Sequence, residues 1–351
     1  MEKNTYNNGN KNAQKIDVSM KKTYVVVTDA DGYILRQKEI NTEIDDLVDY
    51  LNDRKNMKVC LESGSISHWL ARGFINSGFD VVVAEARHLE RYLSARTNKN
   101  DKNDAIGIAE ALRAGLVKPV AIKSETAQAQ QVLLGSRRQL QQTGRTLANA
   151  IRGHLKSVGV RFHKSLSHRN LISETRAVLP EIDTISQHAI EGLCIALTEI
   201  DRQIASLDSH LHKTVRSDTR ATLLQSIPGV GPITALTYLS AIDDAARFDN
   251  SRIIGAYVGL TPRQYASGEV NRIGHISKRG HAECRSMLYE AALCMLTRCK
   301  QPSNLKSWGL RLIKRKGIKR ATIAVARKLA TIMHRMLLTG ELFMPTHRAM
   351  A

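Results

Sequence analysis

Residues 15–39 read KIDVSMKKTYVVVTDADGYILRQKE, and this stretch decides the fold of the N-terminal part of the chain. It contains three short β-prone runs, at 15–19, 22–28 and 33–39, and the last two are joined by the turn sequence DADG. Apolar and β-branched runs separated by such a turn predict an antiparallel meander with a hairpin.

The residues that follow alternate between helical and strand patterns. Helices are expected near 42–53 and 67–77, and strands over 57–62 (MKVCLE) and 80–86 (DVVVAEA). Apolar runs that alternate with helices indicate a parallel component in the sheet. We therefore expect an α/β domain over 15–122, preceded by a disordered arm over the polar, Asn-rich residues 1–14.

From Ser124 onward the pattern becomes helical. The stretch 124–155 has no proline and predicts one long helix with Ser124 as its N-cap. A later heptad seam, with spacings of 3 and 4, is typical of a coiled coil. That seam could pack on the preceding helix or on a second copy of the chain. It consists of Ile190, Leu193, Leu197, Ile200, Ile204, Leu207 and Leu211.

The sequence LLQSIPGVGPITALTYLSAI at 223–242 reads as a helix, a tight turn at Gly229 and Gly231, and a second helix. This helix-hairpin-helix pattern presents backbone N–H groups to a DNA phosphate, although a plain corner between two helices is the alternative. The remainder is expected to be helical apart from a Gly/Arg-rich loop at 259–281. The predicted helical domains are 123–220, with the coiled coil, and 221–340, with a tail at 341–351.

Charge and composition narrow the class of protein. The net charge is +19, and 20 Lys and Arg against 7 Asp and Glu in 221–351 concentrate it in the last third. Such a basic segment is expected to lie against phosphates. The five cysteines form no CxxC pair, which favours reduced thiols, and no apolar run is long enough to cross a membrane. We expect a cytoplasmic protein.

Four carboxylates stand where an α/β sheet collects functional groups, at strand ends and at the start of a helix. Each has an ordinary alternative role, as a turn cap or as a partner of the helix dipole. If they converge, their repulsion requires a divalent cation, and oxygen ligands suit Mg²⁺. Lys99 and Lys102 would then favour an approaching phosphate. The four candidates for catalysis and metal binding are Asp17, Glu62, Asp101 and Asp104.

The stretch GLTPRQYASGEVNRIGHISKRGHAECR at 259–285 offers a second site. Ser267 precedes Gly268, so backbone can approach a ligand closely. A serine hydroxyl is a weak nucleophile until a base, a metal or a cationic surround activates it. Ser277 is the rival serine, which we interpret as an N-cap or a phosphate contact. The cations expected to bind nucleic acid here are Arg263, Arg272, Lys278, Arg279 and Arg285.

Six motifs give the chain a resemblance to a known family: IDVS at 16–19, LES at 61–63, NKNDKNDA at 98–105, SIPGVGPITA at 226–235, AYVGLTPRQYASG at 256–268 and ISKRG at 276–280. The chain resembles the DEDD-type insertion-sequence transposases (the IS one-ten family, with its IS one-eleven-eleven branch) and the related pilin-gene invertase. Departures from the family pattern, such as ESGS at 62–65 and Gly268-Glu269-Val270, remove none of the acids.

The resemblance implies an N-terminal RuvC-like (RNase H-like) domain, with the Asp-Glu-Asp-Asp set on Asp17, Glu62, Asp101 and Asp104. It implies that Ser267 attacks the DNA phosphate and becomes covalently linked to a DNA end, with Mg²⁺ assistance. It also implies dimers that assemble into a tetramer on donor and target DNA. The resemblance further implies a noncoding bridge RNA that pairs with both DNAs, and a nucleoid-associated protein of a bacterium or archaeon.

Two other functions remain open from the residues. A RuvC-like junction endonuclease would hydrolyse DNA and release free ends with no protein adduct. A non-enzymatic protein would bind nucleic acid through the hairpin motif and the basic tail, and would not need the four acids.

Overall fold

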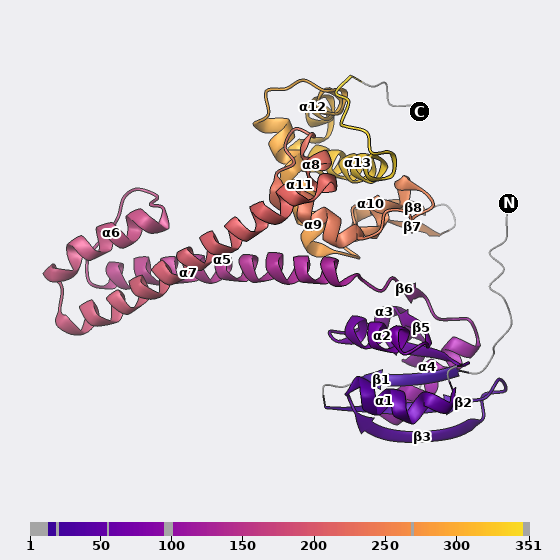
Figure 1. Ribbon diagram of the computed structural model, residues 1–351. Helices are drawn as coiled ribbons and strands as arrows, with labels where there is room; N and C mark the ends of the chain where they lie inside the picture. Colours follow the sequence, from indigo (N-terminus) through magenta and orange to yellow (C-terminus); the bar gives the residue numbers. More distant parts are fainter. Residues whose placement is uncertain (1–12, 19–20, 55, 95–100, 268–269, 347–351) are drawn as a thin grey trace. The chain divides into compact units, whose positions relative to one another are not determined.

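The computed structural model describes residues 13–18, 21–54, 56–94, 101–267 and 270–346, and within them it leaves out the side chains of 13–18, 54, 101, 266–267 and 270–271. The chain divides into two compact units, Met1–Lys123 and Ser124–Ala351. The first is a small α/β unit, and the second is mostly helical (Figure 1). Lys99 and residues 1–12 of the predicted disordered arm lie outside the described residues. The predicted arm boundary at residue 14 is wrong, because Ala13 and Gln14 belong to the first strand.

The N-terminal unit is built on a six-stranded sheet, counted over the described residues, with the order β3-β2-β1-β4-β5-β6. β1, β2 and β3 pair antiparallel, β1, β4 and β5 pair parallel, and β6 is antiparallel to β5. The meander and the parallel component predicted from the sequence are therefore both present. The strands are β1 (Ala13–Val18), β2 (Lys22–Thr28), β3 (Ile34–Asn41), β4 (Lys58–Glu62), β5 (Asp80–Ala84) and β6 (Pro119–Val120).

The turn between β2 and β3 is an aspartate turn. Asp29 Oδ1 accepts hydrogen bonds from the backbone N–H groups of Asp31, Gly32 and Tyr33, at 2.8–3.0 Å. Gly32 takes a φ of 97°, which glycine adopts at little cost. The sequence DADG thus closes the hairpin as predicted.

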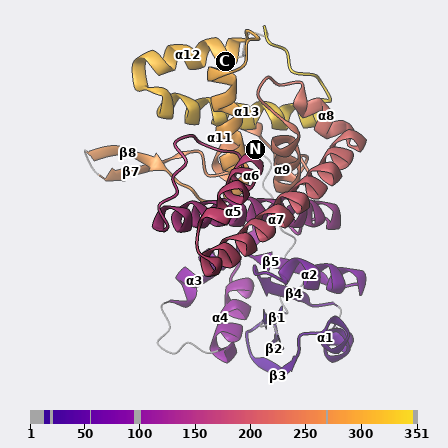
Figure 2. The ribbon, with the colours of Figure 1, turned by 90° about the vertical axis from the view of Figure 1, so that its left-hand side faces the viewer.

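Helices cover both faces of this sheet (Figure 2). α1 (Ile44–Leu51) and α2 (Ser67–Asn76) bury Leu47 and Phe74 against β2, β4 and β5. On the other face, α3 (Ala86–Leu93) and α4 (Asp101–Arg113) pack over Cys60 and Ala84. A short 3-10 helix, η1 (Asn52–Arg54), follows α1. The sequence patterns did not predict α3 or β6.

The helical unit starts with α5 (Glu125–Ser157), which is N-capped by Ser124 as predicted, because Ser124 Oγ accepts the N–H of Ala127 at 3.1 Å. α6 (His168–Val178) and the 3-10 helix η2 (Leu179–Glu181) lead to α7 (Thr184–Ser217), which runs back along α5 (Figure 1). The heptad seam packs within the chain: Ile190 and Leu197 are buried with Ile151 of α5.

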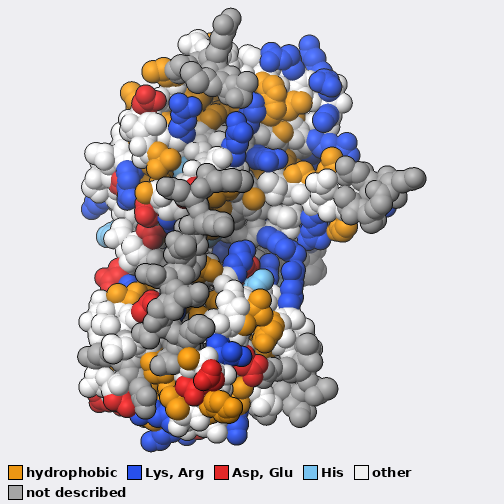
Figure 3. All heavy atoms as spheres, turned by 90° about the vertical axis from the view of Figure 1, so that its right-hand side faces the viewer, with side chains coloured by type: hydrophobic (Ala, Val, Ile, Leu, Met, Phe, Trp, Pro, Cys, Tyr) orange, Lys and Arg blue, Asp and Glu red, His pale blue; other side chains and the backbone are white. Residues whose placement is uncertain are grey.

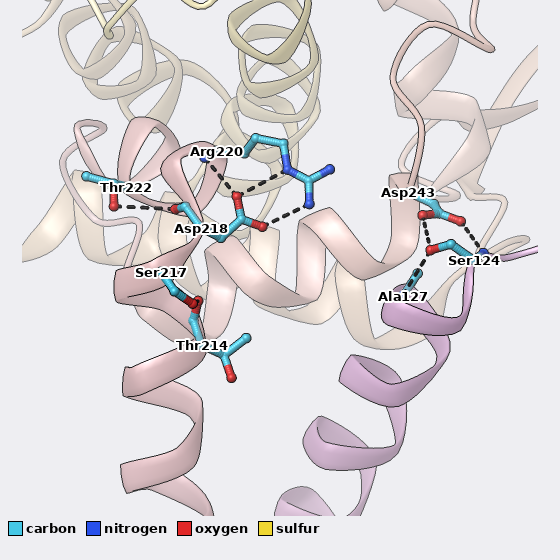
Figure 4. A network of polar contacts seen from close by, with 8 residues as sticks. All are labelled: Ser124, Ala127, Thr214, Ser217, Asp218, Arg220, Thr222 and Asp243. Atoms are coloured by element: carbon cyan, nitrogen blue, oxygen red, sulfur yellow. Dashed lines mark hydrogen bonds and ion pairs between the residues drawn. The ribbon is translucent and has the colours of Figure 1, made fainter.

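A second contact fixes the start of α5 (Figure 4). Asp243, at the end of α9, accepts hydrogen bonds from Ser124 N and Ser124 Oγ, both at 2.7 Å. Asp243 has φ 63° and ψ −89°, a strained conformation for a residue that carries a side chain. The two bonds to Ser124 help to hold this conformation.

The rest of the helical unit has its own core. Tyr238 is fully buried there, and its hydroxyl donates to the carbonyl of Ala330 at 2.7 Å. All five cysteines are free thiols. The remaining helices are α8 (Thr219–Gln225), α9 (Pro232–Ile242), η3 (Ser251–Ile253), α10 (Ile254–Tyr257), α11 (Ala282–Thr297), α12 (Asn304–Lys316) and α13 (Ile318–Thr339).

One prediction for this unit is wrong. The segment 259–281 is not a loop but holds an antiparallel ribbon of β7 (Pro262–Ser267) and β8 (Val270–Ile276). Ser267, Arg263 and Arg272 therefore stand on two paired strands, whereas Lys278 and Arg279 follow β8 and Arg285 belongs to α11.

Candidate active site and nucleic-acid interface

The carboxyl edge of the central strands brings two predicted acids into neighbouring positions of the backbone. β1 and β4 are parallel, and their last paired residues are Ile16 and Leu61. Asp17 and Glu62 each follow by one residue, so the two positions are adjacent across the strands. Neighbouring parallel strands thus end at the same edge with an acid each, as the sequence predicted.

Glu62 stands on the face of the sheet that α4 covers. It lies two residues beyond Cys60 on β4, and alternate residues of a strand share a face. Cys60 packs with Ile108 of α4, and Glu62 pairs in register with Ala84 of the same apolar cluster. The Glu62 side chain is half-buried.

α4 supplies the other two acids from its first turn. The helix begins at Asp101, and it packs on β1, β2 and β4. Buried Ala105 and Ile108 set its rotation, and Asp104 is half-buried one turn from the start. Lys102 is exposed on the same turn. The backbone therefore brings the two helix acids to the face of the sheet on which Glu62 stands.

The donor set is chemically suited to a magnesium ion, because all four groups are carboxylates. Among side chains that the structure describes, which include those of Glu62 and Asp104 but not those of Asp17 and Asp101, no cluster of three or more His, Cys, Asp or Glu is found. The fit of the site to Mg²⁺ thus rests on the strand register and on the start of α4.

The second site is the β7–β8 ribbon, whose first strand ends at Ser267. Two glycines hold its base. A Cβ atom on Gly259 would lie 2.0 Å from the carbonyl oxygen of Arg279, and one on Gly280 would lie 1.8 Å from that of Tyr257. Both glycines also have positive φ angles, 74° and 91°. The backbone on either side of the ribbon is therefore locked together in a way that only glycine permits.

The cations predicted around the serine differ in their surroundings. Arg285 donates to the carbonyl of Val258 at 3.1 Å, so it braces the base of the ribbon. Arg263 donates to the carbonyl of Ser277 at 3.3 Å. Arg272, Lys278 and Arg279 are exposed, which leaves their charged groups accessible to a phosphate.

Ser277 is not an N-cap, contrary to one of the two roles predicted for it. α11 begins at Ala282 and is capped by His281, whose Nδ1 accepts the N–H of Cys284 at 3.2 Å. Left-handed backbone at Lys278 (φ 54°) and Gly280 separates Ser277 from the helix. The phosphate-contact role of Ser277 stays a prediction.

The turn between α8 and α9 has the predicted helix–turn–helix form. Gly229 has a φ of 92°, and a Cβ atom there would lie 2.7 Å from the carbonyl oxygen of Ala291, so this glycine allows close packing on α11. Gly231 is the N-cap of α9 and has open space around it. Of the two, Gly231 has the surroundings that a phosphate contact needs.

Asp218 and Arg220 brace the start of α8 (Figure 4). Asp218 accepts the backbone N–H of Arg220 at 2.9 Å and pairs with its guanidinium at 2.9 Å. Burial acts to raise the pKa of Asp218, but the hydrogen bonds and charge of Arg220 outweigh it, and the pKa lies below its ordinary value. The same hydrogen bond raises the pKa of Arg220.

A cationic surface on α12 and α13 was not predicted residue by residue. Residues 291–340 contain twelve Lys and Arg and no Asp or Glu, which is the sequence signal. Figure 3 shows Lys and Arg side chains gathered on the helical unit, in the upper part of the view. The members around the α12–α13 junction are exposed, and among the described residues they form no ion pair: Arg311, Lys314, Arg315, Lys316, Lys319 and Arg320.

Comparison with known proteins matches both units. The model of the Transposase IS116/IS110/IS902 family matches residues 221–307, and a second transposase model matches residues 16–160. The transposase for insertion sequence element IS1111A of Coxiella burnetii is 32% identical over 295 residues, which cover 82% of this chain and 78% of that protein. The chain belongs to the IS110 family of insertion-sequence transposases.

Other relatives agree with this assignment. A putative transposase (y4pF/y4sB) of Sinorhizobium fredii is 30% identical to this transposase over 310 residues, 88% of this chain and 79% of that protein. The pilin gene-inverting protein of Moraxella bovis is 33% identical over 140 residues, 40% of this chain and 42% of that protein. The predicted family is therefore confirmed, and membership implies DNA strand cleavage and rejoining. Among its described helices, this transposase has none long and apolar enough to span a membrane.

Proposed function

We propose that this transposase moves its own element by cutting and rejoining DNA through a covalent link to Ser267, with Mg²⁺ held by Asp17, Glu62, Asp101 and Asp104. The observation that carries the proposal is the backbone register: positions 17 and 62 are adjacent at the ends of parallel strands, and α4 packs on both strands. A meander followed by parallel strands, with an acid on each central strand, supports a RuvC-like assignment for this domain.

The proposed magnesium ligands are the four carboxylates, and the metal would polarise the phosphate and offset the charge that develops on it. In this proposal, the chain's own contribution is to hold acids from three separate segments at one edge of the sheet. Half-buried Glu62 and Asp104 are supported by the apolar cluster beneath α4. Lys99 and Lys102 would attract the phosphate to this edge.

The proposed chemistry at Ser267 is a transesterification. Its Oγ forms a bond to phosphorus as one phosphodiester P–O bond breaks. The serine hydroxyl loses its proton, and the leaving oxygen takes up a proton and becomes a DNA hydroxyl. The phosphoserine link keeps the energy of the broken bond, so a DNA hydroxyl can later displace the serine and rejoin a strand. Arg263, Arg272, Lys278, Arg279 and Arg285 would hold the phosphates on either side.

The proposed partners are donor DNA, target DNA and a noncoding bridge RNA that pairs with both, with dimers assembling into a tetramer. The cationic surface around α12 and α13 supports contact with a nucleic-acid backbone. Gly231 marks a second contact at the α8–α9 turn, which Gly229 allows to pack closely on α11. These surfaces supply affinity for phosphates, whereas base pairing with the RNA would supply sequence choice.

The test is a denaturing gel of end-labelled DNA from the element's ends, incubated with the full chain, Mg²⁺ and RNA transcribed from the element's flank. The wild-type protein should produce a protein-linked DNA band. Ser267→Ala should abolish this band while DNA and RNA binding persist, and Ser277→Ala is the matched control that should keep it. A normal adduct from Ser267→Ala would contradict the nucleophile, and cut ends without any adduct would indicate a hydrolytic endonuclease.

A further inference from the structure

The β7–β8 ribbon, whose first strand ends at the proposed nucleophile, exposes two large apolar side chains. Tyr265 is 58% exposed and Ile273 is 73% exposed. By contrast, Ile276, three residues further along β8, packs against the core of the helical unit. Both side chains project from a narrow ribbon into solvent, where a partner that encloses the ribbon would bury them.

The two side chains stand on opposite faces of the ribbon. Tyr265 pairs with Arg272, and Ile273 pairs with Gln264. Paired residues of an antiparallel ladder share a face and successive residues alternate, so Tyr265 and Arg272 lie on one face and Ile273 on the other. A flat protein surface would cover one face only, whereas a partner that encloses the ribbon would cover both.

The ribbon is built to hold these side chains in place. The tight packing at Gly259 and Gly280 fixes its base, and a register shift between Pro262 and Gln264 marks a bulge, which bends and twists a ribbon. The Tyr265 ring lies against Gly274, where a Cβ atom would be 3.4 Å from Tyr265 Cε2. The aromatic ring is therefore supported on one side and open to solvent on the other.

The charges around the ribbon identify the partner as a polyanion. Arg272, Lys278 and Arg279 are exposed, and Glu269 is the only acid in 259–281. Strands and two-stranded ribbons of DNA-binding proteins lie in the major or the minor groove of the duplex. Proteins that lie in the minor groove insert apolar side chains between base steps, which unstacks the bases and kinks the duplex. Cations on the ribbon and an apolar group on each face match this mode.

We propose that the ribbon enters duplex DNA at the cut and separates the base pairs there, with Ile273 as the wedge and Tyr265 stacking on a freed base. The inference rests on the proposed function, because it places this DNA at Ser267. Strand exchange requires the bases beside the cut to leave their partners, and burial of both apolar side chains would offset the loss of stacking. Ile273 and Tyr265 are thus positioning residues.

The test uses permanganate, which oxidises unstacked thymines, on DNA carrying the element's ends. Ser267→Ala protein, which does no chemistry, should make thymines beside the cut reactive. Ile273→Thr in this background keeps a β-branched side chain but removes the apolar wedge, and it should lower that reactivity by about tenfold. Tyr265→Thr should lower the permanganate reactivity as well. The conservative variants Ile273→Val and Tyr265→Phe should keep the reactivity of the parent protein. Ile253→Thr, at a position 46% exposed on η3, is the matched control and should change nothing.

A second measurement uses Ser267-competent protein and DNA with mismatched base pairs beside the cut. The adduct rate that Ile273→Thr loses on paired DNA should recover on this pre-opened DNA. Unchanged permanganate reactivity in Ile273→Thr, or an adduct defect that mismatches do not relieve, would overturn the wedge. A change in the oligomeric state alone would overturn it too, because the ribbon would then be a protein contact. The permanganate arm needs no adduct, so its outcome is separate from failure of the proposed nucleophile.

Discussion

The two proposed sites of this transposase are built in opposite ways. The acidic site belongs to central strands and a packed helix, where buried neighbours such as Cys60 and Ile108 fix the positions of half-buried carboxylates. The ribbon site stands on two exposed strands, and its order comes from close backbone packing at Gly259 and Gly280. The first site depends on side-chain packing beneath it, and the second depends on the absence of side chains at its base.

This difference suits the two proposed tasks. Carboxylates that share a cation must stay close together despite their repulsion, and a rigid sheet edge holds them. A nucleophile that meets a large substrate must be accessible, and an anchored ribbon presents it. Substitutions should therefore distinguish the two sites. Replacing the acids should slow the chemical step, replacing the glycines should disturb the ribbon, and replacing the surface cations should weaken DNA binding.

The largest effect is expected from the acids. Asp104→Asn and Glu62→Gln keep the side-chain size but remove a metal-binding charge, and each should lower the DNA cleavage rate by about a thousandfold. DNA binding, measured by gel retardation, should hold within a factor of about two. Cleavage at the wild-type rate by either variant would contradict the proposed metal site.

The next effect is expected at the base of the ribbon. Gly280→Ala places a Cβ atom 1.8 Å from the carbonyl oxygen of Tyr257 at a positive φ, so the backbone must shift. We expect the free energy of unfolding to fall by about 3 kcal/mol, measured by urea denaturation.

Gly153 of α5 provides the control. It has open space around it, and Gly153→Ala should raise the free energy of unfolding by about 0.5–1 kcal/mol, because alanine favours a helix. Equal effects from the two glycine substitutions would refute the close packing at Gly280.

A moderate effect is expected at the cationic surface. Replacing Lys314 and Arg315 together by Gln should flatten the dependence of log affinity on log salt by about 2, because two phosphate contacts are lost. The chemical step should be unchanged at saturating DNA. Arg202→Gln is the matched control, since Arg202 already pairs with Glu199 at 2.7 Å on α7. An unchanged salt slope for the double variant would exclude this surface from the DNA path.

The smallest effect is expected at the start of α8. The pKa of Asp218 lies below its ordinary value of 3.8, so its contribution to stability is present above that value and is lost as the pH falls through the folded-state pKa. Arg220 is 52% exposed, so the pair contributes under about 1 kcal/mol. The Asp218→Asn variant should lack this pair's contribution, so its stability, measured by thermal denaturation, should fall less between pH 7 and pH 3 than that of the wild type. An unaltered pH profile would show that the pair does not contribute.

Much of the fold follows from local sequence patterns. The β-branched run at 22–28 and the DADG turn predict the hairpin, and Ser124 before a proline-free stretch predicts the start of α5. The heptad seam predicts a helix with a buried stripe, and that stripe packs on α5. One acid at the end of each of two strands and a pair of acids at the start of a helix indicate the proposed acidic site, because sheet topology determines where strands end.

Other features depend on contacts that no local pattern encodes. Gly and Arg interrupt the β-prone residues of 259–281, so the sequence indicates a loop there, whereas the ribbon depends on contacts such as that of Gly280 with Tyr257. Of the two roles predicted for Ser277, the N-cap role is wrong because left-handed backbone at Lys278 and Gly280 delays the start of α11. The bonds from Ser124 to Asp243 join residues 119 apart in the chain.

The most direct test of the central claim is to locate the DNA attachment by mass spectrometry. Trypsin cleaves after Arg263, Arg272 and Lys278, so Ser267 and Ser277 fall in separate peptides, 264–272 and 273–278. After reaction with the element's DNA and nuclease digestion, a phosphate or nucleotide remnant is predicted on peptide 264–272, at Ser267. A remnant on 273–278, or unmodified peptides in a reaction that has cut DNA, would contradict the account.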